Sequence, residues 1–258
     1  MRNRQINSNV EWQAWGRVDP LYAVASWEGR NKDGTNPWTS EEFYQLGKID
    51  WQRFLSDWKK YGVDSHSCLE IGCGAGRLTM HIAQCFKTTH ALDISIDMID
   101  YAREHINNHA VQFHLSNGID IPLSNNSVSA AFSSHVFQHF DSLLHASAYF
   151  AEISRVLRSE GSLMIHLPIY QWPSTTSIET KTFNLIYSLR KHFGDLKASA
   201  KRRLITRGLS RPIMRMLQYP VTYFYETLPK YNFIDIEVHI STTPTNNDLH
   251  SFVFARKK

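Results

Sequence analysis

The 258-residue sequence contains no uninterrupted apolar run of about 18 residues, the length that a membrane-spanning helix requires. Its first residues, 1–5, lead into polar residues rather than into the hydrophobic core of a secretion signal. We therefore expect neither a transmembrane segment nor secretion, although a peripheral contact with a membrane remains open.

Cysteine is scarce as well, with only Cys68, Cys73 and Cys85. Their spacing matches neither a zinc knuckle nor the close cysteine triplet of a radical enzyme, and an odd number suits a disulfide framework poorly. We expect reduced, partly buried thiols in a cytoplasmic protein, and no metal site.

Charge is modest in net amount and unevenly placed. The net charge is +4 and 20% of the residues are charged, yet residues 181–215 contain ten Lys and Arg residues and a single acid, Asp195. Three interpretations of this basic segment stay open: a solvated helical face, a clamp for an anionic group of a substrate, or a surface for anionic lipid or nucleic acid.

A glycine-rich segment at residues 69–79, LEIGCGAGRLT, is the most informative feature that is present. An apolar run ends around Glu70, and a helical pattern follows. Three glycines occupy every second position between them: Gly72, Gly74 and Gly76. This pattern predicts a tight strand-to-helix turn that brings bare backbone against a ligand. Arg77 stands where a dinucleotide-binding G-x-G-x-x-G fingerprint would have its third glycine.

The middle of the chain alternates between strand and helix patterns, which favours a parallel sheet covered by helices. The expected strands are residues 67–71, 90–94, 111–115, 128–134 and 162–167. The expected helices are residues 77–86, a helix capped by Ser95, and residues 142–157 with Gly161 as the terminating residue.

The C-terminus changes the pattern. Residues 233–240 and 249–255 read as strands joined by a turn at 243–247, which is too short for a parallel crossover. We therefore expect an α/β fold with a Rossmann-like, doubly wound sheet of seven strands, mostly parallel with an antiparallel last strand.

Two additions flank this core within the chain. Residues 1–60 are rich in Trp and Tyr and carry a capping box at Thr39 and Glu42. They form either a helical layer stapled onto the sheet or, in a sharper interpretation, a layer that also closes over the ligand site. Within a domain of residues 61–258, residues 170–225 read as a basic helical insertion between the fifth and sixth strands, a candidate cap on the acceptor side.

Asp93 ends the second expected strand, 21 residues after Gly72. A carboxylate at this place can accept hydrogen bonds from both ribose hydroxyls of an adenosine. NAD enzymes use the same device, and a helix-capping role is the plainer alternative.

The segments 115–123, 125–128 and 132–140 complete a recognisable combination with the glycine loop. Over roughly residues 66–168 the chain resembles the type 11 small-molecule methyltransferases, a class I group that includes the ubiquinone and menaquinone methyltransferases. The sequence departs from the family in having Asn117 and Ser129 at two positions that more often carry aspartate.

The resemblance implies binding of S-adenosylmethionine, release of S-adenosylhomocysteine, and methyl transfer to an oxygen or nitrogen atom of a small or medium-sized molecule. The basic segment leaves an anionic acceptor as one option. In this reading Asn117 meets the adenine amino group and Gly118 donates a backbone hydrogen bond to the ring. The implied cofactor-binding residues are Glu70, Gly72, Cys73, Gly74, Gly76, Arg77, Asp93, Ile94, Met98, Asn117, Gly118 and Ser134.

His135 and His139 fall at the end of the fourth strand, where the transferred methyl group would point. Either could act as a general base, since histidine titrates near neutral pH. The alternative is that both only line or pack the pocket, because a sulfonium is already a good leaving group and positioning can supply much of the rate.

Three other functions remain as alternatives. The basic insertion could serve an RNA methyltransferase, although residues 133–136 lack the motif of amino-methylating DNA enzymes, so nucleic acid is disfavoured. The fold could also be a non-catalytic binding module. An NAD-linked oxidoreductase is disfavoured by Arg77 and by the antiparallel C-terminal strands.

Overall fold

The computed structural model describes residues 7–170, 214, 216–245 and 248–258. Most of the expected basic insertion, residues 171–213 and 215, therefore lies outside the described residues, and its helices stay a prediction. Among the described residues, no helix is long and apolar enough to cross a membrane.

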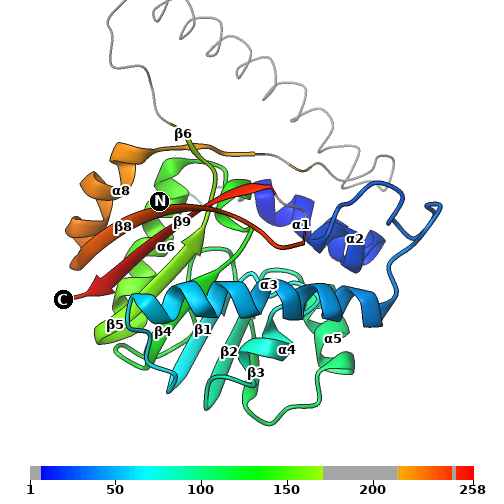
Figure 1. Cartoon of the computed structure of the whole chain (residues 1–258), viewed down its shortest axis with the longest axis horizontal. Helices are drawn as coiled ribbons and strands as arrows, with labels where there is room; N and C mark the ends of the chain where they lie inside the picture. Colours follow the sequence, from blue (N-terminus) through cyan, green and yellow to red (C-terminus); the bar gives the residue numbers. More distant parts are fainter. Residues whose placement is uncertain (1–6, 171–213, 215, 246–247) are drawn as a thin grey trace, which may run out of the picture.

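A seven-stranded sheet forms the centre of the molecule, in the order β3-β2-β1-β4-β5-β9-β8 (Figure 1). The first five strands are parallel to one another, and β9 is antiparallel to both of its neighbours. This confirms the fold expected from the sequence. The strands are β1 (Ser67–Ile71), β2 (Thr88–Asp93), β3 (Val111–Leu115), β4 (Val128–Ser133), β5 (Leu157–His166), β8 (Phe233–Thr242) and β9 (Leu249–Lys257).

Helices cover both faces of this sheet (Figure 1). The α-helices among the described residues are α1 (Asn7–Val18), α2 (Pro20–Val24), α3 (Ser40–Lys60), α4 (Thr79–Ile82), α5 (Ile96–His105), α6 (Leu143–Val156) and α8 (Val221–Thr227). Short 3-10 turns occur at Phe137–His139 and Leu228–Tyr231. A separate pair, β6 (Ile169–Tyr170) and β7 (Tyr219–Pro220), brings the two ends of the insertion together.

The core divides along the two faces of the sheet because successive residues of a strand point to opposite sides. On one face, aromatic residues of α3 pack against Phe132 of β4. On the other face, α6 packs with Phe150 and Ile153 in a cluster that contains Ala131. The capping box starts α3 as expected: Thr39 Oγ1 accepts the Glu42 amide at 3.2 Å, and the Glu42 carboxylate accepts the Thr39 amide at 3.3 Å.

The N-terminal layer lies at the carboxyl ends of the strands. Helices α1 and α2 contact α5, and a cluster that includes Trp15 and Leu21 joins them to Ala75 of the glycine loop and Met98 of α5. The layer therefore reaches the edge of the sheet at which ligands bind in open α/β folds.

Two local predictions were wrong. The helix expected at 77–86 is only α4, because the amides of Gln84 and Cys85 bond to carbonyls three residues back and tighten the chain into turns before β2 begins. Gly161 does not terminate α6. The helix ends at Val156 and β5 starts at the next residue, so Gly161 lies within a strand irregularity beside Glu160, whose φ is 61°.

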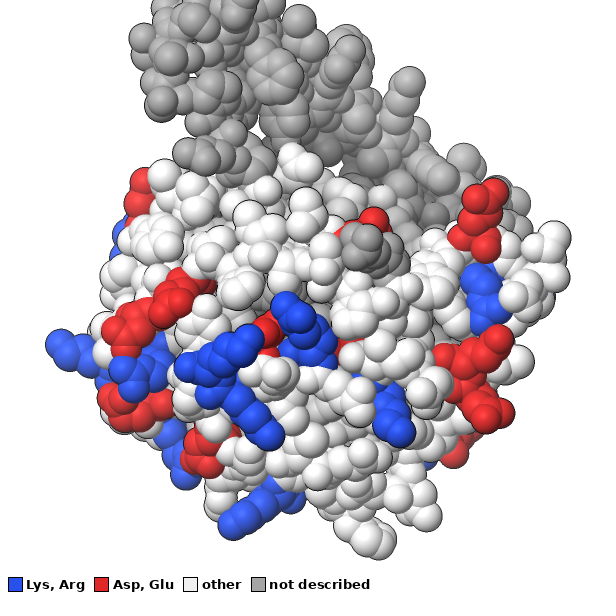
Figure 2. All heavy atoms as spheres, viewed as in Figure 1, with Lys and Arg blue, Asp and Glu red and all other residues white. Residues whose placement is uncertain are grey.

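On the face shown in Figure 2, Lys and Arg side chains are interspersed with Asp and Glu side chains. The described residues of this face therefore present both signs of charge rather than a continuous basic surface.

Replacing the buried anchor of α3 tests this packing. Trp58 has an exposed fraction of 0%, and its Nε1 donates to Ser162 Oγ at 2.7 Å. Trp58→Phe should lower the free energy of unfolding by about 1–3 kcal/mol through a lost hydrogen bond and an unfilled volume. Urea denaturation measures the change. The control Trp27→Phe, at a residue that is 37% exposed, should cost less than about 0.5 kcal/mol; equal losses would contradict the anchoring role.

Candidate functional site

The glycine loop connects β1 to α4 and is held against β2. The amides of Gly72 and Cys73 both donate to the carbonyl of Leu92, at 2.7 and 3.0 Å. Gly72 and Gly74 have φ values of 74° and 52°, the left-handed region that favours glycine. A Cβ at Gly72 would collide with Val136, so the close approach also requires a bare backbone.

A cavity of about 760 Å³ opens beside this loop, a size ordinary for a small-molecule site. Residues of α1, α2, the post-β3 loop and the ends of β1, β2 and β4 contribute to its wall. Of the expected site residues, the structure brings together in this wall Gly72, Gly74, Arg77, Asp93, Ile94, Met98, Gly118, Ser134, His135 and His139. It does not place Glu70, Cys73, Gly76 or Asn117 there.

Asp93 fixes the loop to the start of α5. Its Oδ2 accepts the Gly74 amide at 2.8 Å, and its Oδ1 accepts the Ser95 amide at 2.9 Å. Burial raises the pKa of this carboxyl, and the backbone hydrogen bonds act in the opposite direction. Each carboxylate oxygen has a second lone pair, so the group can still accept hydroxyls from a ligand in the cavity.

Glu70 lies beneath the loop rather than in the cavity. It is 3% exposed, and its Oε2 accepts the hydroxyl of Thr79 at 2.6 Å. The pKa of Glu70 is raised to about 7, mainly by burial. The nearby charge of Asp93 raises this pKa as well, whereas the Thr79 hydrogen bond lowers it. This geometry supports a role for Glu70 in orienting the loop.

Gly76 and Cys73 serve packing. A Cβ at Gly76 would approach Ile106 and Ala102, so this glycine allows the loop to lie against α5 and the residues that follow it. Cys73 is 4% exposed, and burial raises the pKa of its thiol well above the usual value. The thiol is therefore neutral and poorly nucleophilic.

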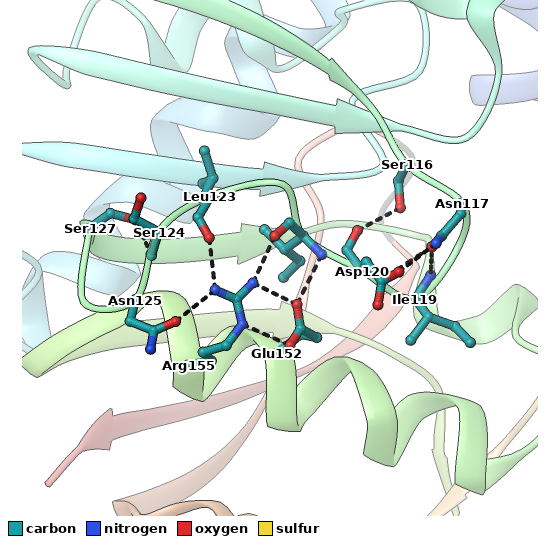
Figure 3. A network of polar contacts seen from close by, with 11 residues as sticks. Ser116, Asn117, Ile119, Asp120, Leu123, Ser124, Asn125, Ser127, Glu152 and Arg155 are labelled. Carbon is teal, nitrogen blue, oxygen red and sulfur yellow. Dashed lines mark hydrogen bonds and ion pairs between the residues drawn. The ribbon is translucent and has the colours of Figure 1, made fainter.

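Asn117 uses its side chain within its own turn, as Figure 3 shows. Its Oδ1 accepts the amides of Ile119 and Asp120 at 3.0 and 2.9 Å, and its Nδ2 donates to the Asp120 carboxylate at 2.6 Å. Arg155 of α6 holds the continuation of this loop by donating to the carbonyls of Ile121 and Leu123, both at 2.7 Å. The expected adenine contact of the Asn117 amide is thus not supported by this arrangement.

His145 is a cavity residue that no sequence motif singles out. Its Nε2 bonds to the carbonyl of Gly118 at 2.6 Å, so this nitrogen is the donor and Nδ1 carries the lone pair of the neutral ring. Burial lowers its pKa. Nδ1 is buried and has no hydrogen-bond partner within the described part of the chain. The ring stacks on Phe140 at a centroid distance of 4.4 Å.

Residues 69–165 match the family model described as a methyltransferase domain. Residues 69–165 therefore belong to a methyltransferase domain of the class I, S-adenosylmethionine-dependent type.

Two curated relatives are malonyl-[acyl-carrier protein] O-methyltransferases. The one from Hahella chejuensis is 36% identical over 98 residues, which are 37% of this chain and 34% of that protein. The one from Pectobacterium atrosepticum is 30% identical over 125 residues, or 47% and 45% of the two chains. The chain thus spans less than half the length of the curated relatives that it matches.

Solved structures share the fold of the methyltransferase domain. The magnesium protoporphyrin IX methyltransferase of Synechocystis PCC 6803, with bound S-adenosylhomocysteine, has a TM-score of 0.56 at 16% identity and covers 95% of this chain and 93% of its own. A methyltransferase from Aquifex aeolicus has a TM-score of 0.52 at 16% identity and covers 86% and 100%. At these identities the likeness shows the fold alone.

Arg77 of the methyltransferase domain joins three separate segments. Its guanidinium pairs with Asp50 of α3 at 2.5 Å, and Asp50 also accepts the hydroxyl of Thr245 from the β8–β9 connection at 2.8 Å. Arg77 is 6% exposed, and its Nε has no hydrogen-bond partner among the described residues. Arg77 therefore ties the loop to both α3 and the C-terminal strands while it lines the cavity.

The two histidines expected near the methyl group have different surroundings. His139 packs its ring 4.7 Å from Trp12 of α1, and the ring nitrogen Nε2 lies 3.0 Å from Gln138 Nε2. His135 has a φ of 61°, and its Nδ1 bonds to Ser134 Oγ at 2.8 Å. Burial lowers the pKa of His135 well below its usual value, so its ring is neutral near pH 7.

Two further histidines, His166 and His250, line the cavity beside His135. The ring centroids of His166 and His250 lie 4.1 and 5.1 Å from that of His135. Sequence reasoning missed both, because they come from β5 and β9, 84 residues apart, and only the antiparallel pairing of these strands brings them together. The three rings offer nitrogens within 4.8 Å of one another. The sequence led us to expect no metal site and did not predict this grouping.

The raised pKa of Glu70 predicts a pH-dependent stability. Between its ordinary value of 4.5 and the native value of about 7, the native carboxyl holds a proton that the unfolded chain has lost. Stability should therefore fall as pH rises through this window. In Glu70→Gln that loss should be absent. Between pH 4.5 and pH 8, the free energy of unfolding of the variant should therefore rise relative to that of wild type by up to about 3 kcal/mol.

Urea denaturation of the cofactor-free protein from pH 4.5 to 8 measures this difference. Glu104→Gln, at an exposed position of α5, is the matched control and should follow the wild-type curve. Parallel curves for Glu70→Gln and wild type would contradict the buried, protonated state of Glu70.

Proposed function

We propose that the protein transfers a methyl group from S-adenosylmethionine to an oxygen or nitrogen atom of a small or medium-sized molecule. The observation that carries the proposal is one cavity that contains both a glycine loop anchored on Asp93 and a group of histidines. Because the curated relatives are O-methyltransferases, oxygen is the favoured acceptor atom.

When bound, S-adenosylmethionine would supply an electrophilic methyl group on a sulfonium; the acceptor would gain the methyl group as the sulfur–carbon bond breaks, and S-adenosylhomocysteine would leave. Asp93 would accept the ribose hydroxyls, and the bare backbone of Gly72 and Gly74 would allow the methionine portion to approach. His135 and His139 remain candidates for a general base, which this chemistry can use but does not require.

His145 is the residue that we assign to the adenine. The ribose ligand Asp93 ends β2, and Gly118 follows the neighbouring strand β3, so the base would extend toward Gly118. His145 bonds through Nε2 to the Gly118 carbonyl and keeps a lone pair on Nδ1 that has no partner among the described residues, and an adenine amino group is a donor that fits it. The histidine would take the role that the resemblance gave to Asn117.

No specific observation favours another function. The segment 181–215 that raised the nucleic-acid alternative lies largely outside the described residues, and the face in Figure 2 carries both signs of charge. The intact loop and the cavity-lining polar atoms that have no partner among the described residues support an intact ligand-binding site over a degenerate one.

Calorimetry with S-adenosylhomocysteine tests the cofactor site. Asp93→Ala should weaken binding by about 1–3 kcal/mol, as expected for lost hydrogen bonds to a charged group. The control Asp100→Ala removes an exposed carboxylate of α5 and should bind as wild type does. Unchanged affinity of Asp93→Ala would remove Asp93 from the ribose role, and binding of NAD without S-adenosylhomocysteine would overturn the proposed function.

A base analogue tests His145. S-inosylhomocysteine replaces the amino group of the base with a carbonyl oxygen, so it presents an acceptor to the lone pair of Nδ1. Wild type should prefer S-adenosylhomocysteine by about 1–3 kcal/mol, the cost of an unmade buried hydrogen bond. His145→Phe should lose most of this preference in calorimetry, whereas the control His109→Phe, at an exposed position, should keep it. A preference retained in His145→Phe would contradict the assignment.

A further inference from the structure

A chain of hydrogen bonds links the three clustered histidines in a defined order. The backbone amide of His135 donates to His166 Nδ1 at 3.2 Å. His166 Nε2 then lies 2.7 Å from His250 Nδ1. All three residues line the cavity, at the ends of β4 and β5 and at the start of β9.

The backbone amide fixes the direction of this chain. An amide can only donate, so His166 Nδ1 must present a lone pair and the proton of the neutral ring must be on Nε2. His166 Nε2–H therefore donates to His250 Nδ1, and the proton of the neutral His250 ring is on its own Nε2.

Both rings are neutral near pH 7. Burial lowers the pKa of His166 well below its usual value, and the neighbouring His250 and His139 lower it further. Burial also lowers the pKa of His250; Asp248 and Asp50 raise it, and Arg77 lowers it. Neither ring then carries a second proton that would change the direction of the chain.

The consequence is a buried donor without a partner. His250 Nε2 is inaccessible to solvent and makes no hydrogen bond to any residue that the structure describes. An unpartnered buried N–H is costly, so it marks a place where a ligand can supply an acceptor atom. His250 Nε2 cannot serve as a general base in this arrangement, because its lone pair is used by its proton.

The direction of these hydrogen bonds, from His135 through His166 to His250, argues against a metal ion at this site. A metal bound by His166 Nε2 would require the proton of that ring on Nδ1, where it would face the amide proton of His135. The close grouping of three histidine nitrogens therefore forms a hydrogen-bonded chain rather than a preformed set of metal ligands.

We propose that His250 donates its Nε2–H to a carboxylate oxygen of the methyl acceptor, and that His166 is the positioning residue that holds His250 in this donor form. The inference rests on the proposed function and deepens it by naming the acceptor class. A carboxylate suits the site because it can accept from two donors, and Arg77 Nε is a second buried donor that has no partner among the described residues, in the wall of the same cavity.

Nitrogen-15 NMR of the histidine rings tests the chain without any ligand. His166 and His250 should both appear as neutral rings with the proton on Nε2 at pH 7. In His166→Phe, which keeps ring volume but donates nothing, His250 should lose this single form and show a mixture of tautomers or protonation. A wild-type His250 with its proton on Nδ1, or a protonated ring, would overturn the proposal.

Calorimetry of the complex with S-adenosylhomocysteine tests the acceptor, with malonate and benzoate as probes and their methyl esters as uncharged controls. Wild type should bind at least one carboxylate saturably and its ester at least tenfold more weakly. His250→Phe should weaken the carboxylate at least tenfold. His250→Gln, whose amide can place a donor near the position of Nε2, should stay within about threefold.

Any other result of these experiments would overturn either the acceptor assignment or the proposed function. Absence of saturable carboxylate binding, or equal binding by His250→Phe, would overturn the acceptor assignment while binding of S-adenosylhomocysteine still supports the proposed function. Tight binding of Zn²⁺ that is lost in His250→Phe would replace the proposal with a metal site. Failure of S-adenosylhomocysteine to bind would overturn the proposed function itself, and the NMR spectra would then confirm or overturn the hydrogen-bond chain separately.

Discussion

The carboxylate of Asp93 is the constraint on which the site depends. Through the amides of Gly74 and Ser95 it joins the loop after β1 to the helix after β2. Those bonds hold a buried charge that would otherwise be expensive, and burial still raises its pKa. The loop therefore has a fixed shape before any ligand arrives, and the polar groups of the ligand meet oxygens that are already oriented.

The order of the elements followed from the sequence because it rests on local patterns. Apolar strands between helical patterns gave the parallel part of the sheet, and the short turn at residues 243–247 required antiparallel strands at the C-terminus. The prediction that Gly161 terminates the helix was wrong; it was made because a glycine after a helix is typical of a C-cap. In the structure α6 passes directly into β5, and this glycine accommodates a bulge opposite β4, which depends on strand register and not on the local sequence.

The site was predictable only where it lies on one continuous segment. The glycine loop and Asp93 could be identified because their spacing alone carries the chemistry. Asn117 could not be judged, since whether its amide faces a ligand or its own turn is decided by Ile119 and Asp120. His145, His166 and His250 could not be selected, because each gains its role from a backbone group or ring far away in the chain.

Burial of these imidazoles has a consequence for the proposed methyl transfer. Burial lowers the pKa of His135, His145, His166 and His250, so these rings face the cavity as neutral groups with fixed donors and acceptors. Protonated rings would repel the positive charge of a sulfonium. Neutral rings do not, so carboxylates can balance the charge of the sulfonium. An anionic acceptor would then neutralise that charge as the new bond forms. The neutrality of the histidines is therefore as much a part of the proposed chemistry as their position.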